Sequence, residues 1–370
     1  MKTLVVFIAL LYSVTLSAQE RITLLFVGDL MQHQAQIDAA RTPQGEYDYS
    51  ACFSRVKQQI SQADIAIANL EVTLGGAPYR GYPAFSAPDS YLTSILDAGF
   101  DVLLTANNHC LDRGRKGLER TISLLDSLSV PHAGTYRDAA ERKQRYPLFL
   151  KKNGFTIALL NYTYGTNGIR VTAPNVVNYI DREAILQDIR SAQARRPDAI
   201  IACMHWGEEY RSLPNSEQRA LADWLLAQGV THVIGAHPHV IQPMELRTDG
   251  RRQHVVVYSL GNFISNMRAT NTDGGLIFTL ELEKYPLSSS PVPPPGFSRS
   301  TLLCDSASIL YPYCRVTRCG YNLVWTLRPE FTPEKNFILL PVDAPSDSLP
   351  SVARNRLKIF TENSRNLLQK

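Results

Sequence analysis

The sequence predicts an α/β fold, and two observations support this prediction. Short runs of Val, Ile, Leu and Phe recur along the chain with little polar alternation, which is typical of strands covered on both faces. Amphipathic segments with helical periodicity lie between these runs. An alternation of strands and helices is the pattern of α/β architecture.

The expected elements follow this alternation along the chain. The apolar runs predict strands at 22–28, 64–70, 101–106, 155–161, 198–204, 231–236, 254–260 and 275–282. The amphipathic segments predict helices at about 50–62, 88–98, 114–128, 181–194 and 216–228. The last of these follows Asn215, a good helix start, and stops before Gly229, a good helix end. Two more strands, 321–327 and 337–342, and a polar helix, 351–369, are expected to complete the domain.

The ends of the domain are predicted from composition. Residues 1–18 have a charged start, a short apolar core and a small residue, Ala18, where a signal peptidase would cut. The alternative is a membrane anchor, but the apolar run is shorter than the roughly 20 residues that span a bilayer. We therefore expect a secreted protein of the periplasm or cell envelope, without a transmembrane segment after cleavage. The main domain is expected over 19–283, and 284–320, rich in Pro, Ser and Cys, is predicted to be an irregular insertion before 321–370.

Charge and cysteine content narrow the class further. The net charge of +4 is small for 370 residues, and the basic residues are scattered, which argues against nucleic-acid binding. Cys203 lies within an apolar run and is expected to be a buried thiol. An oxidising compartment makes one disulfide plausible among Cys304, Cys314 and Cys319, and the sequence does not choose the pairing.

Polar side chains follow nearly every predicted strand at its carboxyl end. They are Asp29, His33, Asn69, Glu71, Asn107, Asn108, His109, Asp112, Asn161, His205, Glu208, Glu209, His237, His239 and Asn262. Open α/β sheets bind ligands at this edge, so these groups are expected to converge. Each alone is more simply a turn residue or a hydrogen-bonded structural histidine. Together, their carboxylates, amides and imidazoles predict a site for a divalent cation: Mn, Zn, Fe or Mg.

The segment "GAHPHV" raises a geometric question. Two imidazoles on alternate residues of an extended strand point to opposite sides. A tight turn stiffened by Pro238 can instead direct His237 and His239 to two neighbouring metal positions. Cys110, beside His109, is expected to be a buried loop thiol in preference to a ligand.

Six ordered motifs carry a resemblance to a known family. "GDLM", "NLE", "ANNHCLD", "HWGEEY", "GAHPHV" and "YSLGNF", between about residues 22 and 282, resemble the CapA/PgsA proteins of capsule and poly-γ-glutamate synthesis. That family is similar in fold to calcineurin-like metallophosphoesterases. The resemblance implies a sandwich of two sheets flanked by helices. It also implies two kinds of partner: an anionic surface polymer or its precursor, and capsule-synthesis machinery.

The resemblance also implies roles for individual residues. The metal ligands it implies are Asp29, Glu71, Asn108, His205, His237 and His239, with His33, Asn107 and Asn262 as further candidates. One metal position, from Glu71, Asn108, His205 and His237, is complete. The other, with Asp29 and His239, lacks a ligand, because Met31 stands where phosphoesterases usually have histidine. One metal site is therefore more secure than two.

Two functions from different classes follow. The first is a metal-dependent hydrolase or transferase that cleaves a phosphoester or γ-glutamyl bond. In it His109 protonates the leaving group, and Glu208 or Glu209 orients the attacking water or His205. The second is a non-catalytic metal- or polymer-binding factor for capsule export or anchoring, which the missing histidine at Met31 favours. A serine hydrolase is disfavoured because the chain has no Gly-x-Ser-x-Gly motif.

Overall fold

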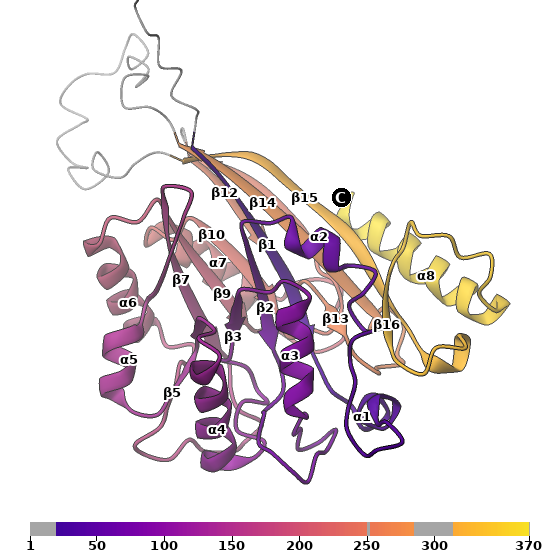
Figure 1. Ribbon diagram of the computed structural model, residues 1–370. Helices are drawn as coiled ribbons and strands as arrows, with labels where there is room; N and C mark the ends of the chain where they lie inside the picture. Colours follow the sequence, from indigo (N-terminus) through magenta and orange to yellow (C-terminus); the bar gives the residue numbers. More distant parts are fainter. Residues whose placement is uncertain (1–19, 250–251, 285–313, 370) are drawn as a thin grey trace, which may run out of the picture.

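The computed structural model describes residues 20–249, 252–284 and 314–369, and these residues form two facing β-sheets with helices on the outer faces (Figure 1). The predicted α/β class and the two-sheet sandwich flanked by helices are confirmed. The predicted signal peptide, 1–18, lies outside the described residues. No helix within the described ranges has the length and hydrophobicity that a membrane span requires.

The first sheet has the strand order β16-β15-β14-β1-β2-β3-β4, and β13 also pairs with β1. Its strands are β1 (Arg21–Leu30), β2 (Ile65–Leu70), β3 (Val102–Leu104), β4 (His132–Ala133), β13 (Asn262–Ile264), β14 (Gly274–Lys284), β15 (Cys314–Leu327) and β16 (Ile338–Pro341). Strands β1 to β4 run parallel, whereas β14, β15 and β16 are antiparallel to their neighbours. The carboxyl ends of β1, β2 and β3 therefore lie at one edge.

The second sheet has the order β11-β12-β10-β9-β7-β6. Its strands are β6 (Leu148–Lys152), β7 (Phe155–Thr163), β9 (Ala199–His205), β10 (His232–Ala236), β11 (Met244–Asp249) and β12 (Arg252–Val257). Strands β7, β9, β10 and β12 are parallel. Two short strands, β5 (Thr135–Tyr136) and β8 (Val176–Val177), pair separately.

The helices are α1 (Gln34–Ala40), α2 (Lys57–Ser61), α3 (Asp89–Asp97), α4 (Gly114–Ser127), α5 (Ala139–Arg145), α6 (Arg182–Ala194), α7 (Ser216–Ala227) and α8 (Ser351–Leu368), with a 3-10 turn at Pro329–Phe331. Five of the six predicted helices match within about two residues. The exception is 50–62, where only α2 is an α-helix. At the start of α7, Asn215 and Gln218 form a capping box, which explains the predicted boundary.

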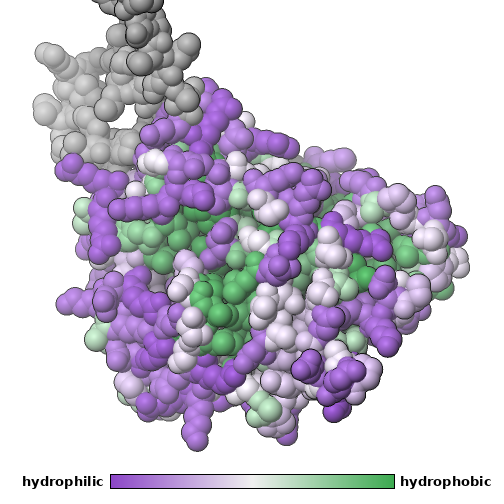
Figure 2. Space-filling model, in the orientation of Figure 1, coloured by the Kyte–Doolittle hydropathy of each residue, from purple (hydrophilic) through white to green (hydrophobic). Residues whose placement is uncertain are grey.

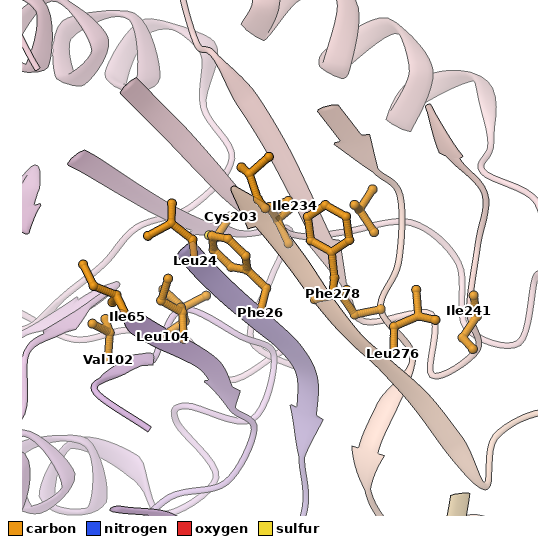
Figure 3. Packing of buried hydrophobic residues seen from close by; sticks show 14 of the residues in the cluster. Leu24, Phe26, Ile65, Val102, Leu104, Cys203, Ile234, Ile241, Leu276 and Phe278 are labelled. Atoms are coloured by element: carbon orange, nitrogen blue, oxygen red, sulfur yellow. The ribbon is translucent and has the colours of Figure 1, made fainter. Parts of the chain in front are cut away.

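The core is layered because successive strand residues point to opposite faces. Leu24 and Phe26 of β1 pack between the sheets with Leu159 of β7, whereas Leu25 of β1 packs outward in the same cluster as Leu92 of α3. Figure 3 shows this packing between the sheets, and Cys203 lies within it as predicted. The face shown in Figure 2 is largely hydrophilic, with a hydrophobic area near its middle.

The predicted insertion 284–320 needs a correction. Residues 285–313 and Cys304 lie outside the described residues, but 314–320 are regular strand, so the irregular assignment is wrong there. Within the described residues, β15 pairs with β14 from Cys314, opposite Lys284, to Trp325, opposite Gly274. Side chains reinforce the pairing: Arg315 Nε donates to Glu283 at 2.5 Å. Cys314 and Cys319 lie on this one strand and are not bonded to each other.

Candidate metal centre

The carboxyl ends of strands from both sheets meet at one edge of the sandwich and bring the predicted polar residues together. In the first sheet, Asp29 of β1 is in register with Asn69 of β2 and with Asn262 of β13. In the second sheet, His205 ends β9 opposite Ala236, the last residue of β10. Groups distant in the sequence therefore share one buried site.

Glu71, directly after β2, lies at the middle of this site. Its side chain is fully buried, and its Oε1 has no hydrogen-bond partner among the described residues. Oε1 lies 3.7 Å from Nε2 of His205 and 3.9 Å from Nε2 of His239. Ligand atoms bound to one transition metal at about 2.1 Å are separated by roughly 3–4 Å, so each of these two distances fits a pair of ligands on one ion.

The "HPH" turn directs both imidazoles to the same place. His237 and His239 have left-handed backbones, with φ of 101° and 59°, so the segment is not extended. Their ring centroids lie 5.8 Å apart, and both rings are buried. The tight turn expected from Pro238 is therefore present.

His239 joins the turn to the first sheet. Its Nδ1 lies 3.2 Å from Oδ2 of Asp29 and 3.0 Å from Oδ1 of Asn262. The Asn262 amide donates to the carbonyl of Thr272, so its oxygen faces His239. Asn262 thus orients His239 in this structure.

Three asparagines hold the other ligands in place. Asn69 Nδ2 donates to Asp29 Oδ1 at 2.8 Å and lies 3.3 Å from Nδ1 of His205. Asn108 Oδ1 lies 2.7 Å from Nε2 of His205. Asn107 binds the backbone of Leu70 at 2.8 Å, so it positions the loop.

Burial and neighbouring charges shift the pKa values of the carboxylates and histidines of the site in different directions. Burial, followed by the charge of Asp29, raises the pKa of Glu71, and burial lowers the pKa of His237 to about 3 and that of His205 well below its usual value. Burial also opposes the charged forms of Asp29 and His239, but their mutual hydrogen bond and attraction lower the pKa of Asp29 and raise that of His239. His205 and His237 are therefore neutral near pH 7, the form in which imidazole binds metal.

In the part of the chain that the structure describes, three groups of donors have the spacing of a metal site: Glu71, His205 and His237; Asp29, Glu71 and His239; and Glu209, His237 and His239. Within each, the ligand atoms lie within 4.8 Å of one another. The first two share Glu71, as a carboxylate between two ions would. The donor set, with an unpartnered buried oxygen at its centre, fits borderline-hard divalent cations.

His109 lies beside these donors and forms a pair with Asp112 that the sequence analysis does not anticipate. Its Nδ1 lies 2.8 Å from Oδ2 of Asp112, which also accepts from the Phe85 amide at 2.8 Å. Phe85 packs edge-on against the imidazole, with centroids 4.6 Å apart. The H-x-x-D spacing at the start of a turn was the available signal for Asp112.

Of the remaining candidates, one lies with the metal donors and the others do not. Glu209 lies with the donors, whereas Glu208 is exposed and contacts Asn215 and Arg211. His33 caps α1, with Nδ1 at 3.2 Å from both the Gln36 side chain and the Asn266 amide, and belongs to no donor group among the described residues. Cys110 is buried, and burial raises its pKa to about 12, in keeping with an inert thiol.

Exposed tyrosines surround the site and were not anticipated. Tyr164 lies over His237 with ring centroids 4.5 Å apart, and Tyr210 lies 6.2 Å from the ring of His239. Tyr82 lies 6.4 Å from the ring of His109. No periodicity marks these loop residues, so the sequence offers no signal for them.

Two solved structures are similar to this chain over most of its length. Its structure is similar to calcineurin-like phosphoesterase YfkN from Bacillus subtilis (12% identity, TM-score 0.45, 95% of this chain and 100% of the other). It is also similar to NAD nucleotidase NadN of Haemophilus influenzae (11% identity, TM-score 0.47, 95% of this chain and 61% of the other).

Two curated relatives have related names. The chain is 27% identical over 272 residues to "Capsule biosynthesis protein CapA" of Bacillus anthracis, covering 70% of this chain and 63% of that protein. It is 32% identical over 195 residues to "PGA biosynthesis protein CapA" of Bacillus subtilis, covering 51% of this chain and 49% of that protein. The chain thus spans less than two thirds of either relative. Residues 23–267 match the family described as bacterial capsule synthesis protein PGA_cap, and the protein belongs to that family.

Proposed function

We propose that this protein is a metal-dependent hydrolase or transferase that acts on a surface polymer or its precursor, at a phosphoester or γ-glutamyl bond. The observation that carries the proposal is the buried, unpartnered Oε1 of Glu71 between His205 and His239. An unpaired buried carboxylate oxygen is costly unless something positively charged binds it. A divalent cation satisfies this need.

The ligands would be divided between two positions that share Glu71. Asn108, His205 and His237 would complete one, and Asp29 and His239 would contribute to the other. When bound, the metal supplies Lewis-acid polarisation of the scissile bond. Asn69 holds the carboxylate of Asp29 in place, and Asn262 holds the ring of His239.

His109 would be the proton donor. Asp112 accepts the proton on Nδ1. Nε2, which has no hydrogen bond among the described residues, would carry the second proton of the imidazolium, and this proton goes to the leaving group. A histidine oriented by a carboxylate in this way can protonate a leaving oxygen or nitrogen. The edge contact with Phe85 limits rotation of the ring.

The names of the relatives support the choice of substrate and location. Both contain the words "biosynthesis protein CapA", one with "capsule" and the other with "PGA". We therefore place the activity in the cell envelope, with an anionic surface polymer or its precursor as substrate and capsule-synthesis machinery as partner.

The test uses purified protein stripped with chelator and reloaded with Mn²⁺, Zn²⁺, Fe²⁺ or Mg²⁺. Phosphodiesters and poly-γ-glutamate are supplied, and bond cleavage or transfer is followed. Activity that depends on metal and is lost in His205→Ala, with the circular dichroism spectrum retained, supports the proposal. Metal-independent activity, or none with any substrate, contradicts it.

One observation favours a non-catalytic role as the second candidate. Met31, at the position where phosphoesterases usually have a ligand, is buried in the apolar core. A site short of one ligand can bind metal or polymer for export or anchoring without turnover. Stoichiometric metal and polymer binding without bond cleavage would favour this role.

A further inference from the structure

We propose that the carboxylate of Glu209 is a direct ligand of the metal centre and takes the place of the histidine that Met31 replaces. This inference rests on the proposed function, because it assumes that the site binds metal. It gives Glu209 a role different from the orientation of water or of His205.

The donor atoms of Glu209 are suitably placed. Its carboxylate lies with the ring nitrogens of His237 and His239 in a group whose ligand atoms are all within 4.8 Å of one another. Both histidines are buried, whereas Glu209 is exposed. The group therefore combines two donors from inside the protein with one from the solvent side. His237 Nδ1 is buried and has no hydrogen-bond partner among the described residues, so it is available to bind a metal ion.

The backbone holds Glu209 against the "HPH" turn. The amide of Tyr210, the next residue, donates to the carbonyl of Pro238 at 2.8 Å. Pro238 stands between the two histidines. This hydrogen bond therefore holds the loop that carries Glu209 beside both of them. The φ of Tyr210 is 65°, and the φ values of His237 and His239 are also positive. Residues on both sides of this hydrogen bond therefore have left-handed backbone conformations. Such backbone conformations cost about 1–3 kcal/mol each and concentrate at functional sites.

The centre has a need that Glu209 meets. Asp29, Glu71 and His239 supply three donors, and Met31 supplies none because its side chain packs in the core. His33 is held by the Asn266 amide and by Gln36. A fourth protein ligand would have to come from another loop, and Glu209, which follows β9 of the second sheet, shares His239 with this donor set.

The neighbouring Glu208 provides a matched control. It is an exposed glutamate on the same loop, but its carboxylate lies 3.6 Å from Nε of Arg211 and accepts from Asn215 at 3.4 Å. It belongs to no donor group among the described residues. Glu208→Gln and Glu209→Gln change the same charge one residue apart.

The experiment measures metal binding without activity. Chelator-stripped wild type, Glu208→Gln and Glu209→Gln are titrated with Mn²⁺ by isothermal calorimetry and, after desalting, assayed by elemental analysis. We expect Glu209→Gln to weaken one class of Mn²⁺ site about tenfold or more and Glu208→Gln to bind like wild type. The Co²⁺-loaded proteins should show a changed visible absorption spectrum only in Glu209→Gln, because the ligand set changes.

The outcomes separate this inference from the proposed function. Equal Mn²⁺ affinity and equal Co²⁺ spectra in all three proteins overturn the role of Glu209 while leaving the metal centre intact. Equal weakening in both variants also overturns it, because the effect is then one of net charge. A wild-type protein that binds no divalent metal contradicts the proposed function itself.

Discussion

Nδ1 of His109 lies 2.8 Å from Oδ2 of Asp112, and the same oxygen accepts the amide of Phe85. The backbone amide of Phe85 therefore holds the carboxylate of Asp112, and this carboxylate in turn holds the imidazole of His109. Asp112 is a positioning residue in this arrangement, because it acts through His109.

Asp112→Asn should reduce kcat about 10- to 100-fold, because the amide no longer selects the proton position on His109. KM should change little, since Asp112 faces the imidazole. In a His109→Asn background the same substitution should cause no further loss. Additive losses in the double variant would show that Asp112 acts independently of His109.

Glu71→Gln should abolish stabilisation by metal. Wild type should gain about 2.7 kcal/mol in free energy of unfolding at a metal concentration one hundred times Kd. In the variant the central ligand is neutral, so the melting temperature should not respond to metal. Thermal denaturation with and without Mn²⁺ checks this, and an undiminished response places the ion elsewhere.

His232 should make the protein sensitive to acid. Burial lowers its pKa to about 3, and its Nδ1 accepts the Val255 amide at 3.1 Å, which requires the unprotonated ring. The unfolded chain binds this proton below about pH 6.5 and the folded protein does not. The contribution of the neutral His232 ring to the free energy of unfolding is therefore complete above about pH 6.5. It is lost toward pH 3, by up to about 1.4 kcal/mol per pH unit. Urea denaturation of His232→Gln between pH 7 and 4.5 should give a shallower decline than wild type, and parallel declines would contradict it.

Gly28→Ala should damage the site through the backbone. An added Cβ would collide with the carbonyl of Gly261, whose oxygen also accepts the amide of Asp29 at 3.1 Å. We expect a loss of about 1–3 kcal/mol in the free energy of unfolding, together with weaker metal binding. Gly165→Ala is the control, because nothing lies within 4 Å of its added Cβ. If the two variants behave alike, the close approach at Gly28 is unimportant.

The sequence predicted the strands and the meeting of their ends better than the choice between neighbouring residues. Buried apolar runs define strands, and parallel strands bring Asp29, Glu71 and His205 to one edge whatever the loops do. The path of each loop determines which of two neighbouring residues reaches the site. Glu208 and Glu209 are equivalent in the sequence and differ only through the path of the backbone after β9.

The wrong assignment at 314–320 has a similar cause. Residues 314–320 looked irregular because "CRVTRCG" carries charge and no apolar run, yet pairing with β14 makes them strand. His33, a further candidate ligand near Asp29 in the sequence, accepts the amide of Asn266 from a distant loop at 3.2 Å. Such long-range contacts leave no local pattern.

The position of the donors at the seam of the sandwich has a mechanical consequence. Asp29 and Glu71 extend from the first sheet, whereas His205 and His237 extend from the second. An ion bound by both sets would cross-link the sheets at their rim. Metal binding would then make the rims of both sheets more rigid. Loading with metal would therefore slow amide hydrogen exchange in β2 and in β9 together.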